Sequence, residues 1–139
     1  MNASKDKGTR AETAVVRYCR GFFPAAERRT LHGREDVGDI LLCPGVVIEV
    51  KAGKTAQTAS LRKIQAWIGE TQREVANAGA EIGLLVTQRQ GLGLTRVADW
   101  ECWSVEDSAV TMRSLRDTLE LLSDEALRDS LQLLSDEGR

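Results

Sequence analysis

The sequence predicts an α/β fold in which a mixed β-sheet is flanked by helices and followed by a helical C-terminal appendage. Two amphipathic helical patterns enclose a strand–turn–strand pattern, and two more strand-like segments follow the second helix. With 139 residues, 42% of them hydrophobic, the chain can bury one core but not two. We therefore expect one domain over residues 1–112 and an acidic, leucine-rich helical tail over residues 113–139.

The first helix is expected over residues 9–20, with Thr9 as its N-cap. Its apolar residues recur at helical spacing and form one stripe: Ala11, Ala14, Val15, Tyr18, Cys19 and Phe22. A polar, basic stretch over residues 27–33 then reads as a short strand. Glu12 lies at the edge of the apolar stripe, so its carboxylate should half-face the core.

Residues 39–43 and 46–52 are two apolar, strand-like segments joined by Pro44-Gly45, which is a strong turn signal. We therefore expect a β-hairpin. Side chains alternate between the two faces of a strand, so Glu49 and Lys51 should share one face while the aliphatic residues beside them occupy the other. The hairpin thus places a carboxylate next to an ammonium group.

A second amphipathic helix is expected over residues 60–77, ended by Gly79. Residues 81–87 read as a buried aliphatic strand and residues 98–105 as a further strand, with a glycine-containing loop over residues 88–95 between them. This order of helices and strands fits a mixed sheet with helices on its faces.

The tail contains a 12-residue repeat, because residues 116–126 recur nearly unchanged as residues 128–138. At 3.6 residues per turn, this period rotates the face of a continuous helix by about 120° per repeat. We therefore expect two short helices interrupted at Ser123-Asp124, where this pair can cap the second. Two roles remain open for the tail: a solvated appendage, or an element that binds a partner or a second copy of the chain.

Charge is unevenly distributed, although the net charge is only −2. Residues 1–63 contain 12 Lys and Arg against 7 Asp and Glu, whereas residues 64–139 contain 7 against 14. The N-terminal half could therefore face phosphate groups.

No apolar run approaches the roughly 20 residues of a membrane helix, and the N-terminus lacks the apolar core of a signal peptide. Three widely spaced cysteines fit a reducing compartment, so we expect a cytoplasmic protein without membrane contact.

Two carboxylates and an ammonium group are expected to converge on the hairpin, because Asp39 begins the strand next to the one that carries Glu49 and Lys51. Carboxylates this close repel each other unless a cation lies between them, and hard oxygen ligands favour Mg²⁺ or Mn²⁺. The constellation therefore predicts a divalent metal site. Two alternatives stay open: Asp36 takes the place of Asp39, or Glu49 and Lys51 merely solvate an exposed face.

Further groups could complete this corner of the molecule. The backbone carbonyl of Val50 is a candidate third ligand, and the carboxylate of Glu12 a fourth. Lys51 beside an attacking water could orient that water, lower its pKa or stabilise charge on a phosphoryl group. Such a set suits metal-assisted hydrolysis of a phosphodiester. Mechanisms that need two histidines are excluded, because His32 is the only histidine.

Gly38-Asp39 followed by Glu49-Val50-Lys51, after a helix that carries Glu12, resembles the PD-(D/E)xK nuclease superfamily. Within it, the chain looks most like small Holliday junction resolvase-like proteins of archaea and of phages that infect actinobacteria. The stretches that look alike are Lys7-Gly8-Thr9, Glu27-Arg28-Arg29, residues 33–40, residues 47–52 and residues 77–80. The resemblance covers roughly residues 5–105 and leaves the tail outside.

The resemblance implies a restriction-endonuclease-like core in which Glu12, Asp39 and Glu49 are metal ligands, direct or through water, and Lys51 is the catalytic lysine. Gly38 stands where the superfamily name has proline, a common substitution in the resolvase group. The implied protein is a Mg²⁺-dependent endodeoxyribonuclease, with Mn²⁺ as a substitute, that resolves Holliday junctions or other branched DNA in recombination or repair, in the host cytoplasm if phage-encoded. The alternatives are a nuclease for duplex, flapped or single-stranded DNA, and a non-catalytic DNA-binding protein on the same fold.

DNA is the expected partner, and a homodimer would place two sites on the two scissile strands of a junction. The residues expected to contact phosphates are Lys5, Lys7, Arg10, Arg28, Arg29 and Arg34, with Lys54, Arg62 and Lys63 as a second group near the site. The expected dimer surface is the outer sheet edge with Trp100 and Trp103. The tail leucines are expected to reinforce it: Leu119, Leu121, Leu122, Leu131, Leu133 and Leu134.

Two other features of the sequence bear on ligand binding and on the site. Gly53-Lys54-Thr55 resembles the end of a phosphate-binding loop, but the first glycine of that loop would fall at Ile48, inside a strand. No nucleotide cofactor is therefore expected. Gln65 and Gln72 lie along one edge of the second helix, and a role for Gln72 at the site stays open.

Overall fold

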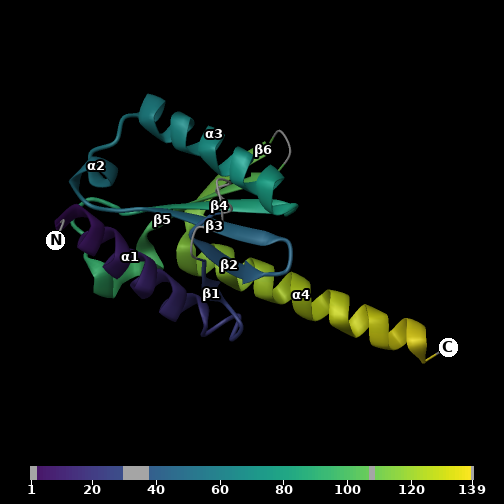
Figure 1. The fold of residues 1–139 in the computed structure, drawn as a ribbon. Coiled ribbons are helices and arrows are strands. Elements are labelled where there is room, and N and C mark those ends of the chain that lie inside the picture. The colour runs from purple at the N-terminus through teal and green to yellow at the C-terminus, as the bar shows by residue number, and fades with distance from the viewer. Residues whose placement is uncertain (1–2, 30–37, 107–108, 139) are drawn as a thin grey trace.

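The computed structural model describes residues 3–29, 38–106 and 109–138, with residues 3–7 described by their backbone alone. Within these ranges, six strands form one mixed sheet in the order β1-β2-β3-β4-β5-β6 (Figure 1). The strands are β1 Glu27–Arg28, β2 Ile40–Cys43, β3 Val46–Lys51, β4 Ile82–Thr87, β5 Glu101–Glu106 and β6 Ala109–Ser114. β3 and β4 are parallel, and the other neighbouring strands are antiparallel. The predicted α/β class with a mixed sheet is thereby confirmed.

Helices cover both faces of this sheet (Figure 1). They are α1 Ala3–Cys19, α2 Lys54–Gln57, α3 Leu61–Ala78, the 3₁₀ helix η1 Leu94–Asp99 and α4 Leu115–Glu137. α1, η1 and the start of α4 enclose the larger core, which includes Ile40, Ile48 and Leu84. On the other face, Trp67 of α3 packs with Leu85 of β4 in a smaller cluster. The sheet is therefore the middle of three layers.

The β2–β3 hairpin and α3 form where the sequence predicts them. Pro44-Gly45 connects the two strands, and Gly45 has a φ of 88° that favours glycine. The hydroxyl of Ser60 accepts a hydrogen bond from the N–H of Lys63 at the start of α3, and Gly79 ends the helix with a left-handed φ of 63°. These local signals fix both ends of the helix that connects the parallel strands β3 and β4.

Gly83 of β4 allows α3 to lie close to the sheet. A Cβ atom at position 83 would lie 2.6 Å from Cγ2 of Thr71 and 2.7 Å from Cγ2 of Val75, too close for a side-chain carbon. The absence of that atom brings α3 over the sheet, where its side chains reach residues at the end of β3.

The C-terminal third differs from the prediction. Residues 94–99 form η1, so the fifth strand begins at Glu101 rather than at residue 98, and β6 was not predicted. The expected break at Ser123-Asp124 is wrong, because α4 is one continuous helix. Only the first turns of α4 need an apolar face, since Leu115 and Leu119 are fully buried in the core and the rest is largely exposed. The second copy of the repeat therefore faces another direction on the same helix without disturbing the packing of Leu115 and Leu119 in the core. At the other end of the chain, α1 begins at Ala3, before the expected residue 9.

The expected dimer surface is also corrected. Trp100 is fully buried, Trp103 belongs to β5, and β6 rather than β5 forms the edge of the sheet. The large exposed apolar side chains of that edge are Val110 and Met112. Leu119 is buried, whereas α4 exposes Leu121, Leu127, Leu131, Leu133 and Leu134. Figure 1 shows the C-terminal half of α4 extending away from the sheet.

Among the described helices, none is both long and apolar enough to cross a bilayer.

Candidate active site at the β2–β3 hairpin

Glu49 and Lys51 share one face of β3, as the alternation of the strand predicts, and α3 covers that face. Glu49 is 7% exposed, and Lys51 is partly buried. The Nζ atom of Lys51 lies 3.4 Å from Oε1 of Glu49. Glu49 is therefore not a solvent-exposed surface residue, and the alternative in which Glu49 and Lys51 merely solvate one face of the hairpin is wrong for Glu49.

Asp39 is held against the same end of β3. Its backbone N–H donates a hydrogen bond to the carbonyl of Ile48 (2.9 Å), and its Oδ2 accepts one from the N–H of Val50 (2.8 Å). The carboxylate thus lies beside the residue that separates Glu49 from Lys51. Asp36, the rival candidate, lies outside the described residues.

The pKa of Asp39 lies well above its usual range. Burial is the largest cause, followed by the negative charge of Glu49, and the charge of Glu12 adds to both. The hydrogen bond from Val50 and the charge of Lys51 act in the opposite direction but do not outweigh them. The charges of Glu49, Glu12 and Lys51 therefore all act on the carboxyl group of Asp39.

Glu12 of α1 takes part in this group but also has a partner of its own. Its Oε2 forms an ion pair with a terminal guanidinium nitrogen of Arg28 on β1. A predicted metal ligand and a predicted DNA contact are thus joined to each other. Its carboxylate is partly exposed, as the position of Glu12 at the edge of the apolar stripe predicts.

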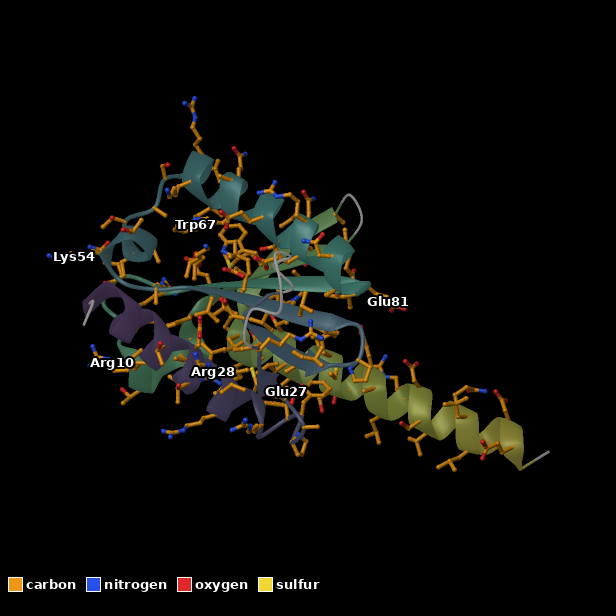
Figure 2. The ribbon with its side chains drawn as sticks, in the orientation of Figure 1. Arg10, Glu27, Arg28, Lys54, Trp67 and Glu81 are labelled. Atoms are coloured by element: carbon orange, nitrogen blue, oxygen red, sulfur yellow. The ribbon has the colours of Figure 1, made fainter. Side chains whose placement is uncertain are left out.

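Two residues that contact Lys51 were not predicted from the sequence. Oε2 of Glu70 on α3 lies 3.1 Å from Nζ of Lys51, and the ring centroid of Trp67 lies 5.7 Å from the same atom. Figure 2 shows Trp67 between α3 and the sheet. Burial alone would lower the pKa of Lys51, but the charges of Glu49 and Glu70 outweigh burial and raise it.

A signal for Glu70 exists in the sequence. Glu70 and Thr71 each lie three or four residues from both Trp67 and Glu74, which places all four along one side of a helix. Trp67, Thr71 and Glu74 are the buried residues of α3. Carboxylates on the buried side of a helix need partners, and this could have directed attention to the facing strand.

The donor set at this site suits a hard divalent cation. The buried carboxylate of Glu49 and the partly buried carboxylate of Asp39 repel each other, and a cation would relieve that repulsion. The carbonyls of Ile48 and Lys51 accept hydrogen bonds from Asp39 and Gln88, on opposite edges of β3. Because carbonyl directions alternate along a strand, the carbonyl of Val50 points to the edge where Asp39 lies. No group of three His, Cys, Asp or Glu side chains in the described part of the chain is arranged to hold a metal ion. Asp39, Glu49 and the carbonyl of Val50 are the groups at this site that could hold such an ion.

The predicted DNA contacts lie in different surroundings. Arg10 of α1 and Lys54 of α2 line one pocket together with Gly53, Gln57 and Gln88, at the carboxyl ends of β3 and β4. Figure 2 shows Arg10 and Lys54 at the same end of the molecule. The sequence placed these two residues in separate groups, and the fold joins them.

The remaining basic candidates are placed as follows. Nζ of Lys63 lies 5.7 Å from the ring centroid of Trp67, on the helix that also carries exposed Arg62. The backbone N–H of Arg29 donates to the carbonyl of Asp39. Arg34 and the side chains of Lys5 and Lys7 lie outside the described residues. Gln72 is exposed on α3.

Comparisons with known proteins identify no relative of the chain. No protein-family model matches the chain, no curated protein matches it, and no solved structure matches its fold. The interpretation of the site therefore depends on its own geometry and chemistry.

Proposed function

We propose that the protein is a Mg²⁺-dependent endodeoxyribonuclease of the PD-(D/E)xK type, built on a restriction-endonuclease-like core and acting on branched DNA. The observation that carries this proposal is the convergence of Asp39, Glu49 and Lys51 at the end of β3. The order α1, three antiparallel strands, α3 and a strand parallel to β3 supports the choice of core.

The residues of the chain have distinct tasks in this proposal. Asp39, Glu49 and the carbonyl of Val50 would hold the divalent cation, with Glu12 as an outer carboxylate. Mg²⁺ in such a site polarises a phosphoryl oxygen and makes water a better nucleophile at neutral pH. Lys51 would orient the attacking water and stabilise negative charge on the phosphate. Arg10 and Lys54 would hold the DNA strand through its phosphates.

A second candidate function is a DNA-binding protein without catalytic activity. The observation that favours it is the pairing of Lys51 with both Glu49 and Glu70, an arrangement that also neutralises charge with no cation present. A third possibility keeps the nuclease chemistry and changes the substrate to duplex, flapped or single-stranded DNA. The site residues do not distinguish substrates, because metal-assisted hydrolysis can cleave any phosphodiester.

Cleavage of a labelled four-way junction, compared with duplex, flap and single strand of the same sequences, tests these alternatives. We expect cleavage of the junction with Mg²⁺ or Mn²⁺ and none with EDTA. Glu49→Gln and Asp39→Asn should abolish cleavage and leave DNA binding intact or tighter, because fewer carboxylate charges repel phosphate. Glu81→Gln is the matched control, since Glu81 is exposed at the opposite end of β4 from the site.

Each result has a clear reading. Equal activity on duplex and junction would indicate a nuclease that does not select branched DNA. Binding without cleavage under all metal conditions would favour the DNA-binding protein. Full activity of both Glu49→Gln and Asp39→Asn would remove the active-site assignment.

A further inference from the structure

Lys51 is held by groups from two different elements. Glu49 on its own strand approaches Nζ to 3.4 Å, whereas Glu70 on α3 approaches it to 3.1 Å. The ring of Trp67, also on α3, lies 5.7 Å from Nζ, within the range of a cation–π contact. A long, flexible lysine side chain is thereby brought to one position between the sheet and α3.

The two carboxylates are not equivalent. The side chain of Glu49 is 8% exposed, whereas that of Glu70 is 42% exposed. An ion pair with a partner this exposed contributes little to the stability of a fold. The ion pair therefore contributes little to the stability of the fold. Its stronger effect is to restrict where the ammonium group of Lys51 lies.

The geometry of α3 makes this contact possible. Gly83 lets the helix lie close to the sheet at Thr71, the residue next to Glu70. Thr71 Oγ1 also donates a hydrogen bond to the carbonyl of Trp67 (2.9 Å), within the same turn. Glu70 and Trp67 therefore lie on a part of α3 that packs closely against the sheet, within reach of Lys51 on β3.

We propose that Glu70 is a positioning residue that holds the ammonium of Lys51 at the active site, with Trp67 as the surface on which the lysine lies. This inference rests on the proposed nuclease function. It divides the carboxylates by role: Glu49 serves the divalent cation, and Glu70 serves the lysine. Glu70 itself would contact neither the cation nor DNA.

A Mg²⁺ titration of junction cleavage separates these roles. In Glu70→Gln we expect the maximal rate to fall about tenfold, because the ammonium of Lys51 loses one of its two carboxylate partners and is held less well in position. The half-saturating Mg²⁺ concentration and the affinity for DNA should stay as in the wild type. Glu70→Asp, which keeps the charge on a shorter side chain, should recover part of the rate, and Glu81→Gln should change nothing. Folding is not at stake, because the side chain of Glu70 is partly in solvent.

A second measurement needs neither metal nor DNA. In protein with ¹⁵N-labelled lysines, the ammonium signal of Lys51, identified by its loss in Lys51→Arg, should be protected from exchange with water. Glu70→Gln should reduce this protection at least several-fold, and Glu81→Gln should leave it unchanged.

The outcomes distinguish the two proposals. Equal protection in wild type and Glu70→Gln overturns the role of Glu70, whatever the protein does to DNA. A raised Mg²⁺ requirement in Glu70→Gln also overturns it, because Glu70 would then be a metal ligand. If the wild type cleaves no DNA while Lys51 loses protection in Glu70→Gln, Glu70 still positions Lys51, and only the nuclease proposal fails.

Discussion

The backbone N–H of Val50 donates a hydrogen bond of 2.8 Å to Oδ2 of Asp39. This bond ties the carboxylate before β2 to the residue of β3 that lies between Glu49 and Lys51. Two acidic side chains are thereby held close together in a partly buried place, against their mutual repulsion. A folded protein tolerates such an arrangement at a cost in stability, which is common at functional sites.

The first prediction concerns the stability of the metal-free protein. Because the pKa of Asp39 is higher in the folded chain than the ordinary value of about 3.9, the folded state binds a proton more tightly than the unfolded state does. The stability that this proton gives is complete below about pH 4 and is lost as the pH rises through the higher folded pKa. We expect Asp39→Asn to remove this loss and to stabilise the protein by roughly 1–3 kcal/mol at pH 8.

Urea unfolding at pH 5 and pH 8 measures this effect. The difference between Asp39→Asn and wild type should be larger at pH 8, and Asp124→Asn on the exposed part of α4 serves as the control. Mg²⁺ should stabilise the wild type more than Asp39→Asn. The same pH dependence in both proteins would show that Asp39 carries no unfavourable charge.

The second prediction concerns Lys51. Lys51→Ala should lower the rate of DNA cleavage by about 10² or more, because an ammonium that stabilises charge on the phosphate is lost. Lys51→Arg should remain well below the wild type, since a guanidinium is larger and cannot occupy the same place between Glu49 and Glu70. Single-turnover cleavage at saturating Mg²⁺ measures this. A loss of less than about threefold in Lys51→Ala would limit the lysine to neutralising Glu49.

The third prediction concerns the pocket at the carboxyl ends of β3 and β4. Arg10 and Lys54 both line it, so we expect both to contact DNA phosphates. Arg10→Ala and Lys54→Ala should each weaken binding of all sequences alike and lower the slope of log affinity against log salt by about one. Arg128→Ala on the exposed part of α4 is the control. Altered base preference in either pocket variant would show sequence readout instead.

The fourth prediction is that the protein forms a homodimer. Exposed leucines on α4 offer a larger apolar surface than Val110 and Met112 of the β6 edge. Sedimentation at micromolar concentration should therefore show a dimer that Leu127→Gln/Leu131→Gln dissociates, while Met112→Lys leaves it intact. The opposite pattern would restore the sheet edge as the interface. A monomeric wild type would exclude both the dimer and coordinated cleavage of two strands.

Much of the hairpin and of α3 could be predicted because their signals are local. Pro44-Gly45 marks the turn, and Ser60 and Gly79 mark the ends of the helix through contacts within a few residues. The alternation of side chains along β3 likewise puts Glu49 beside Lys51 with no knowledge of the rest of the chain.

Other features depend on which surfaces meet. α4 can be continuous because its buried residues, Leu115, Thr118 and Leu119, all lie in its first turns, and no repeat in the sequence reveals this. The pocket shared by Arg10 and Lys54 depends on α1 and α2 both lying at one end of the sheet.

The sequence by itself determined the chemical inventory of the site and the local segments that carry it, because turns, caps and side-chain alternation act over a few residues. Only the tertiary structure decided that Glu70 reaches Lys51. That contact requires the crossover between β3 and β4 and the close approach of α3 at Gly83, and both join residues that are distant along the chain.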